Sequence, residues 1–451
     1  MIQNKTEPKQ YEVIVVGGGV GGVSAAIASA RAGASTLLIE ALERLGGTGV
    51  HSPVGIVIDI ADASGRKIVR GLHEEFFPEL YGVPDIHLKS RIRPYDETKL
   101  LERYERLTAA EANLTVATGT RVSGVTMEGG GITSITCEGR HAGEFAADNY
   151  VDSTAEGFFA VMCGAEWKYG RDEDGAALPA TLSFTLAPVD FDAFGAATPI
   201  HEVTTWKQWG DYSRVLNLPY RKLKEEGRTS NQRENVMGFP FPDRKAILFN
   251  ATRVLAVDPT DPESMRAAYA EGEKQAREYF EEVRKHPAFA EAELHLAPKL
   301  GIREGRRIMG DYVLTVADCL GEARFEDMVV ACGCPIDIHN PTGEGTRLAD
   351  IPGSGYYHIP YRCLLPRGID NLLLGSRCIS GTHEAHSSYR VMAGISPIGQ
   401  AAGVAAALSA KSGDSPREVN AAAIRSVLRQ QGQFVEETDA PEHDKHDTAS
   451  A

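Results

Sequence analysis

The sequence is poor in cysteine and tryptophan, with seven cysteines and three tryptophans in 451 residues. No two cysteines form a CxxC pair, and no iron–sulfur spacing is present. A disulfide-stapled fold, a disulfide reductase and an iron–sulfur protein are therefore not expected. The cysteines are expected to be reduced thiols of a cytoplasmic protein.

Long apolar runs and excess basic residues are also lacking. A membrane helix needs about 20 apolar residues, and the closest run, Ile395–Ala410, is interrupted by Ser, Pro, Gln and Gly. The segment Met1–Gln10 is polar and does not resemble a signal peptide. The 47 Lys and Arg residues face 62 Asp and Glu residues, giving a net charge of −15, which disfavours a nucleic-acid partner. A small-molecule substrate is expected instead, and the oligomeric state stays open.

The first 40 residues have the pattern of a βαβ unit. Tyr11–Val16 is a β-branched run that ends at a glycine-rich turn, and an alanine-rich helical segment follows to Gly33. Ser35–Glu40 is then expected to be the second strand. Gly17, Gly19 and Gly22 give the spacing GxGxxG between strand and helix, which predicts a dinucleotide site at the helix N-terminus.

The remaining chain suggests an interrupted α/β domain. An amphipathic helix is expected over Tyr95–Ala112, and a hairpin with its turn at Gly129–Gly131 follows. The middle third has a different texture, with a long helical stretch at Glu263–Lys285. A final helix is expected with Ser415 as N-cap and Gly432 past its end. We therefore predict a discontinuous Rossmann-like dinucleotide-binding domain (residues 1–164 and 301–432), an inserted α+β substrate domain (165–300) and a disordered tail (433–451).

The identity of the dinucleotide depends on the segments after the glycine motif. Glu40, 18 residues after Gly22, can accept hydrogen bonds from a ribose and disfavours a 2′-phosphate. Gly46 and Gly47 allow a second loop to pass close to a bound flavin. A helix expected to start near Gly399 would direct its dipole at the flavin ring. No second GxGxxG follows a strand, so a separate NAD(P)H domain is not expected.

Several motifs together resemble those of a known family. They are the glycine motif with Glu40, Gly46-Gly47, IREGRRIMGDYVL (302–314), PIDIH (335–339), IPYRCLLP (359–366) and the block from GSRCIS to GQAAG. Over about Tyr11–Ala410, the chain resembles FAD-dependent oxidoreductases related to the fumarate reductase and succinate dehydrogenase flavoproteins. The segment Asp152–Gly157 departs from the usual Ala-Thr-Gly-Asp-Gly pattern but keeps its outline. The resemblance implies that the residues binding FAD are Gly17, Gly19, Val20, Gly21, Gly22, Glu40, Arg44, Gly46, Gly47, Thr48, Val122, Thr154, Gly375, Ser387, Gly399, Ala401 and Ala402.

Three clusters supply candidate catalytic residues. Arg303 and Arg307 would share one face of a strand, with Glu304 on the other, and form either an anion clamp or proton relay or a structural ion-pair strand. Tyr312 follows as a possible hydrogen-bond donor. Asp337 and His339 would share a strand face, with the carboxylate orienting the imidazole. His383 and Arg390, which lie in the family-like C-terminal block, are the leading candidates.

Three other interpretations are less favoured, and one of them, covalent attachment of FAD, stays open. The spacing His-Glu-Ala-His at His383 lacks the HExxH pattern and a third ligand, so no metal site is expected. Covalent attachment of FAD to His51 is possible, but the spacing differs from that of relatives. Cys332 and Cys334 are better explained as buried thiols than as a redox pair.

The sequence thus predicts hydride transfer between flavin N5 and a carbon of a small polar substrate, one bearing a carboxylate or hydroxyl group. Two alternative functions for an FAD-binding protein remain open. One is a non-redox hydratase, lyase or isomerase, and the other is a flavoprotein subunit that passes electrons to a partner. A tRNA-modifying flavoprotein is disfavoured by the acidic charge.

Overall fold

A computed structural model describes residues 7–57, 60–81, 94–196 and 206–435. Its main element is a seven-stranded sheet with strand order β3-β2-β1-β6-β5-β4, with β17 also paired to β6. Strands β1, β2, β3, β6 and β17 are mutually parallel. Strand β5 pairs antiparallel with both β6 and β4. The strands of this sheet are β1 (Lys9–Val16), β2 (Thr36–Ile39), β3 (Leu114–Ala117), β4 (Thr120–Glu128), β5 (Gly131–Gly139), β6 (Gly143–Asp152) and β17 (Leu372–Leu374).

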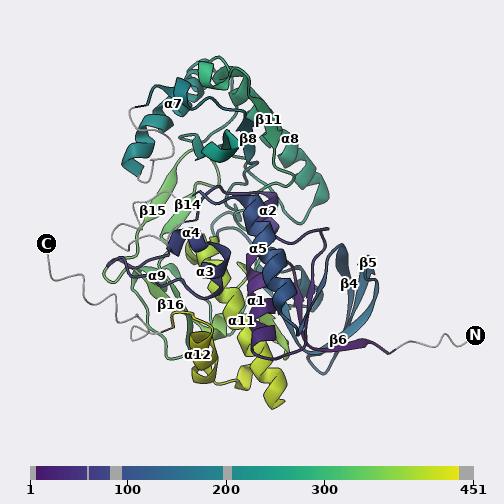
Figure 1. Ribbon diagram of the computed structural model, residues 1–451. Helices are drawn as coiled ribbons and strands as arrows, with labels where there is room; N and C mark the ends of the chain where they lie inside the picture. The colour runs from purple at the N-terminus through teal and green to yellow at the C-terminus, as the bar shows by residue number, and fades with distance from the viewer. Residues whose placement is uncertain (1–6, 58–59, 82–93, 197–205, 436–451) are drawn as a thin grey trace, which may run out of the picture.

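Helices α1 (Val20–Arg31) and α11 (Met392–Ser412) pack closely together (Figure 1). Glycines make this approach possible, because a Cβ on Gly399 would lie 2.1 Å from the Gly21 carbonyl oxygen. Likewise, a Cβ on Gly403 would lie 2.0 Å from the Ala25 carbonyl oxygen. Among the described residues, α11 is the one helix long and apolar enough to cross a membrane, and 83% of its apolar window is buried inside the protein.

The part of the molecule that contains the seven-stranded sheet is the lower part in Figure 1. Apart from α1 and α11, its longest helix is α5, whose N-cap Asp96 accepts hydrogen bonds from Thr98 N and Lys99 N. Besides α1 and α11, the helices of this part are α2 (Gly47–His51), α3 (Leu72–Phe76), α4 (Pro78–Tyr81), α5 (Glu97–Ala110), α6 (Phe158–Met162), α9 (Val316–Leu320), α10 (His383–Tyr389) and α12 (Ala421–Gln430). Its remaining strands are β7 (Trp167–Lys168), β12 (Arg307–Ile308), β13 (Met328–Cys332), β14 (Ile336–His339), β15 (Thr346–Ala349) and β16 (Tyr357–Pro360).

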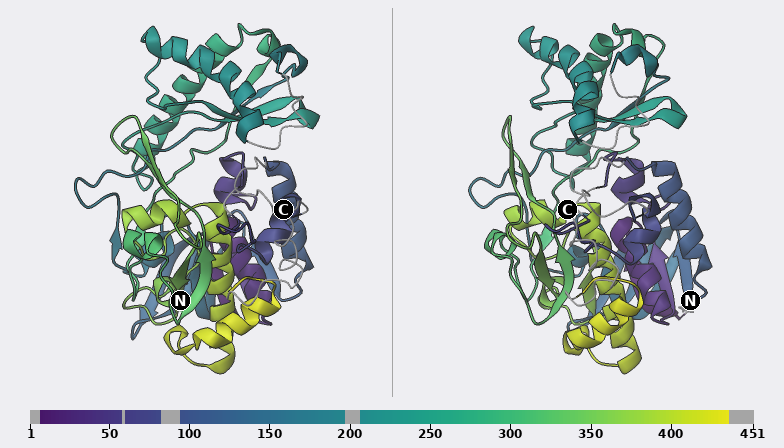
Figure 2. Two further views of the ribbon diagram at one scale, coloured as in Figure 1. Left: turned by 90° about the vertical axis from the view of Figure 1, so that its left-hand side faces the viewer. Right: turned by 60° about the vertical axis from the view of Figure 1, so that its left-hand side comes forward.

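The middle of the chain forms a separate part, seen at the top of Figure 1 and in both views of Figure 2. A four-stranded antiparallel sheet, ordered β11-β8-β10-β9, has its own aromatic core, which includes Phe184, Phe249 and Tyr279. The elements of this part are β8 (Phe184–Ala187), α7 (Trp206–Glu225), β9 (Met237–Phe241), β10 (Ala246–Asn250), α8 (Pro262–Val283) and β11 (Glu293–Leu296). The predicted architecture, a Rossmann-like α/β fold with an α+β insertion, is confirmed. One strand crosses the predicted boundary, since β7 pairs with β12.

Two predictions about the C-terminal region are wrong. The capping box of Ser415 and Glu418 exists, but it caps a short 3₁₀ turn, and α12 starts later with Asn420 as its N-cap. The tail predicted to be disordered from residue 433 begins with packed residues, since Phe434 and Val435 are buried. Their apolar side chains cover the core at the end of the chain. Residues 436–451 lie outside the described part.

Candidate functional site

A cavity of about 1520 Å³ lies between the glycine-rich turn, the start of α11, the β14 strand and the middle part of the chain. Pockets for one small ligand usually measure about 300–1,000 Å³. The cavity can therefore hold a dinucleotide together with a second molecule. Its wall includes Gly17, Gly19, Val20, Gly21, Glu40, Gly47, Thr48, Val122, Thr154 and Ser387, all of them predicted cofactor residues.

The glycine-rich turn has the geometry that a pyrophosphate needs. Gly19 is the N-cap of α1 and no side chain caps the helix, so its first N–H groups remain available to an anion. A Cβ on Gly19 would find no atom closer than 3.8 Å, which leaves open space at this point of the wall. In contrast, a Cβ on Gly22 would lie 1.6 Å from the Gly17 carbonyl oxygen, so Gly22 is required for the turn itself.

Glu40 and the second glycine pair fix the neighbouring loop. The Glu40 carboxylate accepts hydrogen bonds from Gly18 N at 2.6 Å and Leu42 N at 2.8 Å. Gly46 N donates to the Gly18 carbonyl at 2.8 Å, with Gly46 at a φ of 127° that favours glycine. These bonds hold the loop at residues 46–48 against the glycine-rich turn.

Seven predicted cofactor residues lie outside the wall. Arg44 forms an exposed ion pair with Glu105. The other six lie in turns or at close contacts between segments of the chain: Gly22, Gly46, Gly375, Gly399, Ala401 and Ala402. The helix expected to start near Gly399 in fact begins at Met392, which places Val391, Met392 and Ala393 in the wall. Pro397 lies inside this helix, and the sequence offers no polar N-cap before it. For these reasons its true start was not visible in the sequence.

The far end of the cavity brings together three of the predicted catalytic residues, Arg303, His339 and Arg390. Asp337 joins them: its carboxylate lies 3.1 Å from Arg390 Nη2 and 3.4 Å from His339 Nε2. Burial by itself would raise the pKa of Asp337, but the hydrogen bond from His339 and the charge of Arg390 hold that pKa below its ordinary value. Asp337 is therefore an anion at neutral pH.

Arg303 enters the cavity from an irregular segment, where a strand was predicted. Its Nη1 donates to the Pro179 carbonyl at 2.7 Å and to Thr181 Oγ1 at 2.6 Å. Burial and the neighbouring Arg233 and Arg390 charges lower the pKa of Arg303. Among the described residues, no carboxylate forms an ion pair with Arg303, and Asp337 acts on its charge only from a distance.

His339 has a fixed tautomer. Its Nδ1 lies 3.2 Å from Arg253 Nη2, which can only donate, so the ring proton resides on Nε2, which lies 3.4 Å from the Asp337 carboxylate. Burial, helped by the charge of Arg303, lowers the pKa of His339 to about 3. His339 therefore stays neutral at pH 7 and orients Asp337, which reverses the roles expected for this pair.

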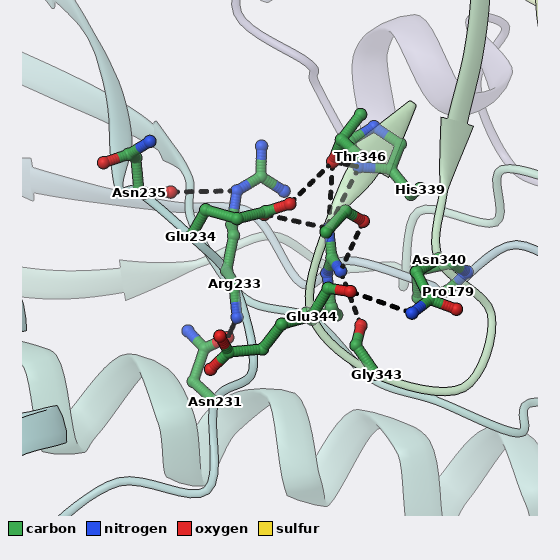
Figure 3. A network of polar contacts seen from close by, with 12 residues as sticks. Pro179, Asn231, Arg233, Glu234, Asn235, His339, Asn340, Gly343, Glu344 and Thr346 are labelled. Atoms are coloured by element: carbon green, nitrogen blue, oxygen red, sulfur yellow. Dashed lines mark hydrogen bonds and ion pairs between the residues drawn. The ribbon is translucent and has the colours of Figure 1, made fainter. Parts of the chain in front are cut away.

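The network in Figure 3 joins the middle part of the chain to the β14–β15 hairpin. Arg253, which is buried, donates to the carbonyls of Gly343 and Gly345 and pairs with Glu234 at 3.1 Å. Thr346 Oγ1 donates to Glu234 at 3.0 Å. Sequence reasoning missed Arg253 and Glu234, because they come from loops that match no motif.

Two predicted catalytic residues, His383 and Tyr312, and the candidate for covalent FAD attachment, His51, do not line the cavity. His383 Nδ1 lies 2.9 Å from Glu304 in a buried network, and Tyr312 donates to Asp318 at 3.0 Å on another surface. His51 Nε2 lies 3.3 Å from the Arg44 carbonyl oxygen, also outside the wall. Cys332 and Cys334 are both buried, and neither forms a disulfide. Within the described residues, no group of three His, Cys, Asp or Glu side chains could hold a metal ion.

A family model described as FAD dependent oxidoreductase matches residues 12–428. The chain belongs to this family. Its cofactor is FAD, and the glycine-rich turn, with Glu40 and the open space at Gly19, fits the adenosine and pyrophosphate parts of that group. No curated protein sequence matches the chain.

Three solved structures that resemble this FAD-dependent oxidoreductase share little sequence identity with it. A geranylgeranyl bacteriochlorophyll reductase-like protein from Thermoplasma acidophilum is 12% identical, with a TM-score of 0.44 over 96% of this chain and 86% of that one. The myxobacterial chondrochloren halogenase CndH is 14% identical, with a TM-score of 0.42 over 94% and 79% of the two chains. A variant of E. coli quinol fumarate reductase FrdA is 12% identical, with a TM-score of 0.40 over 95% and 74%. None of them is close enough to assign a substrate.

Asp152 at the end of β6 should make stability depend on pH. Burial raises the pKa of this carboxyl from 3.8 to about 6, although Thr154 and Ala160 donate hydrogen bonds to it. A raised pKa stabilises the folded state below about pH 4, and this contribution is lost as the pH rises through 6. Relative to Asp152→Asn, the wild type should lose about 2 kcal/mol of unfolding free energy between pH 4 and 7.

Unfolding in urea at each pH measures this difference for the apoprotein. Asp172→Asn is the matched control, because that side chain is 79% exposed. A difference between wild type and Asp152→Asn that does not change with pH would show that Asp152 is already charged at pH 4.

Proposed function

We propose that this FAD-dependent oxidoreductase transfers a hydride to or from a carbon of a small substrate that carries a carboxylate or hydroxyl group. One observation carries the proposal: Arg303 and Arg390 lie in the wall of the same cavity as the glycine-rich turn. FAD bound at that turn supplies the hydride acceptor or donor. The two guanidinium groups supply donors for a substrate oxygen.

The residues around these arginines have separate tasks. Asp337 accepts hydrogen bonds from Arg390 and so fixes its side chain. His339, held by Arg253, orients Asp337 from the other side. Thr181 and the Pro179 carbonyl position Arg303. Fixed donors of this kind stabilise negative charge that develops on a bound oxygen without reorganising during the reaction.

We further infer a cytoplasmic protein without a nucleic-acid or membrane partner. The proposal is supported by the net charge of −15 and by the seven free cysteines.

The test is anaerobic mixing of the FAD-loaded protein with a panel of carboxylic and hydroxy acids. A substrate should bleach the visible absorbance of the flavin in one turnover, and its product should be oxidised by two electrons. If the panel contains a molecule that is converted without bleaching and without an added acceptor, the protein is a non-redox enzyme and the proposal is wrong.

Arg303→Met should lower kcat/KM for such a substrate by about 10²- to 10³-fold, the effect of removing one charged donor from an oxyanion site. Arg303→Lys should recover part of the loss, because it keeps the charge without the planar fork. Arg277→Met, on the surface of α8, is the matched control. The FAD content should stay at the wild-type level in all three variants, and an unchanged rate in Arg303→Met would remove this residue from the site.

A further inference from the structure

Arg233 is a cavity residue whose guanidinium is only partly hydrogen-bonded. It is 5% exposed, its Nε donates to the Asn235 carbonyl at 3.1 Å, and its Nη2 lies 3.6 Å from Met237 Sδ (Figure 3). Its Nη1 is buried and has no partner among the described residues. A buried charged donor without a partner costs free energy, so a ligand that supplies an acceptor here is favoured.

The nearby carboxylates do not neutralise Arg233. Glu234 is engaged by Arg253 and Thr346, and Asp337 is engaged by Arg390 and His339. Burial and the charge of Arg253 lower the pKa of Arg233 to about 10, so the side chain remains a cation at neutral pH. The missing acceptor should therefore be an anion.

The wall beside Arg233 is apolar. Trp209 and Phe239 stack at 6.4 Å between ring centroids, and both rings line the cavity with Met237. The 54–56 segment packs against Phe239, since a Cβ on Gly55 would lie 2.3 Å from Phe239 Cδ2. Val54 is 38% exposed within this cavity. Trp209 and Phe239 are themselves only 5% and 1% exposed, so the apolar surface open to the cavity is mainly that of Val54 and the half-buried Met237. A small polar acid would leave that surface in water.

We propose that the substrate is an amphipathic acid. Its carboxylate binds Arg233, and its aromatic or branched aliphatic body lies against Trp209, Met237 and Phe239. This inference rests on the proposed function for the reaction itself, and it concerns only which molecule the cavity binds. It replaces the small polar substrate expected from the sequence with one that buries an apolar group of several carbons.

The test measures binding to the FAD-loaded protein for three probes: 3-phenylpropionate, acetate and 3-phenylpropan-1-ol. The readouts are the flavin difference spectrum and tryptophan fluorescence, neither of which requires turnover. We expect 3-phenylpropionate to bind at least about tenfold more tightly than acetate, because its ring is removed from water against the apolar wall. Because of its negative charge, 3-phenylpropionate should also bind about tenfold more tightly than 3-phenylpropan-1-ol.

Arg233→Met should abolish the preference for the acid over the alcohol, Arg233→Lys should retain part of it, and Arg277→Met should not change it. Equal affinities of 3-phenylpropionate and acetate would overturn the apolar site, and an unchanged preference in Arg233→Met would overturn the anion site. The two proposals fail separately. If no acid reduces the flavin but this binding pattern holds, only the reaction is wrong; if polar acids reduce the flavin and 3-phenylpropionate does not bind, only this inference is wrong.

Discussion

Gly19→Ala should give a folded protein that no longer retains FAD. The new methyl group meets no protein atom closer than 3.8 Å, so the turn can form as before. The methyl group would instead occupy the open space beside the N-terminus of α1, where the backbone must approach the pyrophosphate. We expect the flavin-to-protein ratio to fall from near one to near zero, and turnover to be lost with it.

Gly22→Ala is the contrasting variant, because its Cβ would lie 1.6 Å from the Gly17 carbonyl oxygen. It should lose both FAD and stability, whereas Gly19→Ala should unfold at the temperature of the wild-type apoprotein. Gly210→Ala is the control, since nothing lies within 4 Å of its Cβ and it sits inside helix α7. Flavin absorbance after gel filtration and thermal unfolding of the apoproteins measure these effects. A Gly19→Ala protein with full FAD content would place the pyrophosphate elsewhere.

The dinucleotide half of the site could be predicted from the sequence because its residues are close together in the chain. A strand, a glycine-rich turn, a helix and an acidic residue within about 30 residues form one local unit. The backbone itself binds the anion there, so glycine spacing carries the information. Five of the ten predicted cofactor residues in the cavity wall belong to this unit: Gly17, Gly19, Val20, Gly21 and Glu40. The other five lie further along the chain and were implied by the family resemblance.

The substrate half could not be predicted in the same way. Arg233 and Arg253 lie in loops of the middle part, and they reach Asp337 and His339 only through tertiary packing. No local spacing records such a meeting of distant segments. The Asp337–His339 pair was predicted correctly because alternation along a strand places both side chains on one face.

The segment 302–307 shows why a period-two pattern can mislead. The strand prediction put Glu304 and Arg307 on opposite faces, but they form a buried ion pair. Only Arg307 and Ile308 belong to a strand, and the side chains of the preceding residues make separate contacts. Arg306, for example, lies over the rings of Phe158 and Trp167.

Glu304→Ala should therefore be among the most destabilising substitutions in the protein. The Glu304 carboxylate is fully buried and bonds to Arg307, to His383 at 2.9 Å and to Leu178 N at 2.9 Å. Its removal leaves the buried Arg307 cation without a carboxylate, which costs about 3–5 kcal/mol of unfolding free energy. Glu273→Ala should change stability by less than about 1 kcal/mol, because its pair with Arg277 is partly exposed.

The same substitution should also lower activity, because Glu304 follows Arg303 directly in the chain. Glu304 is held behind the cavity while Arg303 faces into it, so the buried network fixes the backbone from which the Arg303 side chain extends. Glu304→Gln keeps the size and part of the hydrogen bonding, and should fall between alanine and wild type in both stability and kcat/KM. Urea unfolding and steady-state rates on the same preparations separate the two effects. A loss below about 1 kcal/mol in Glu304→Ala would mean that the other bonds of Arg307, to the carbonyls of Gly381 and Gly170, are sufficient to hold this segment.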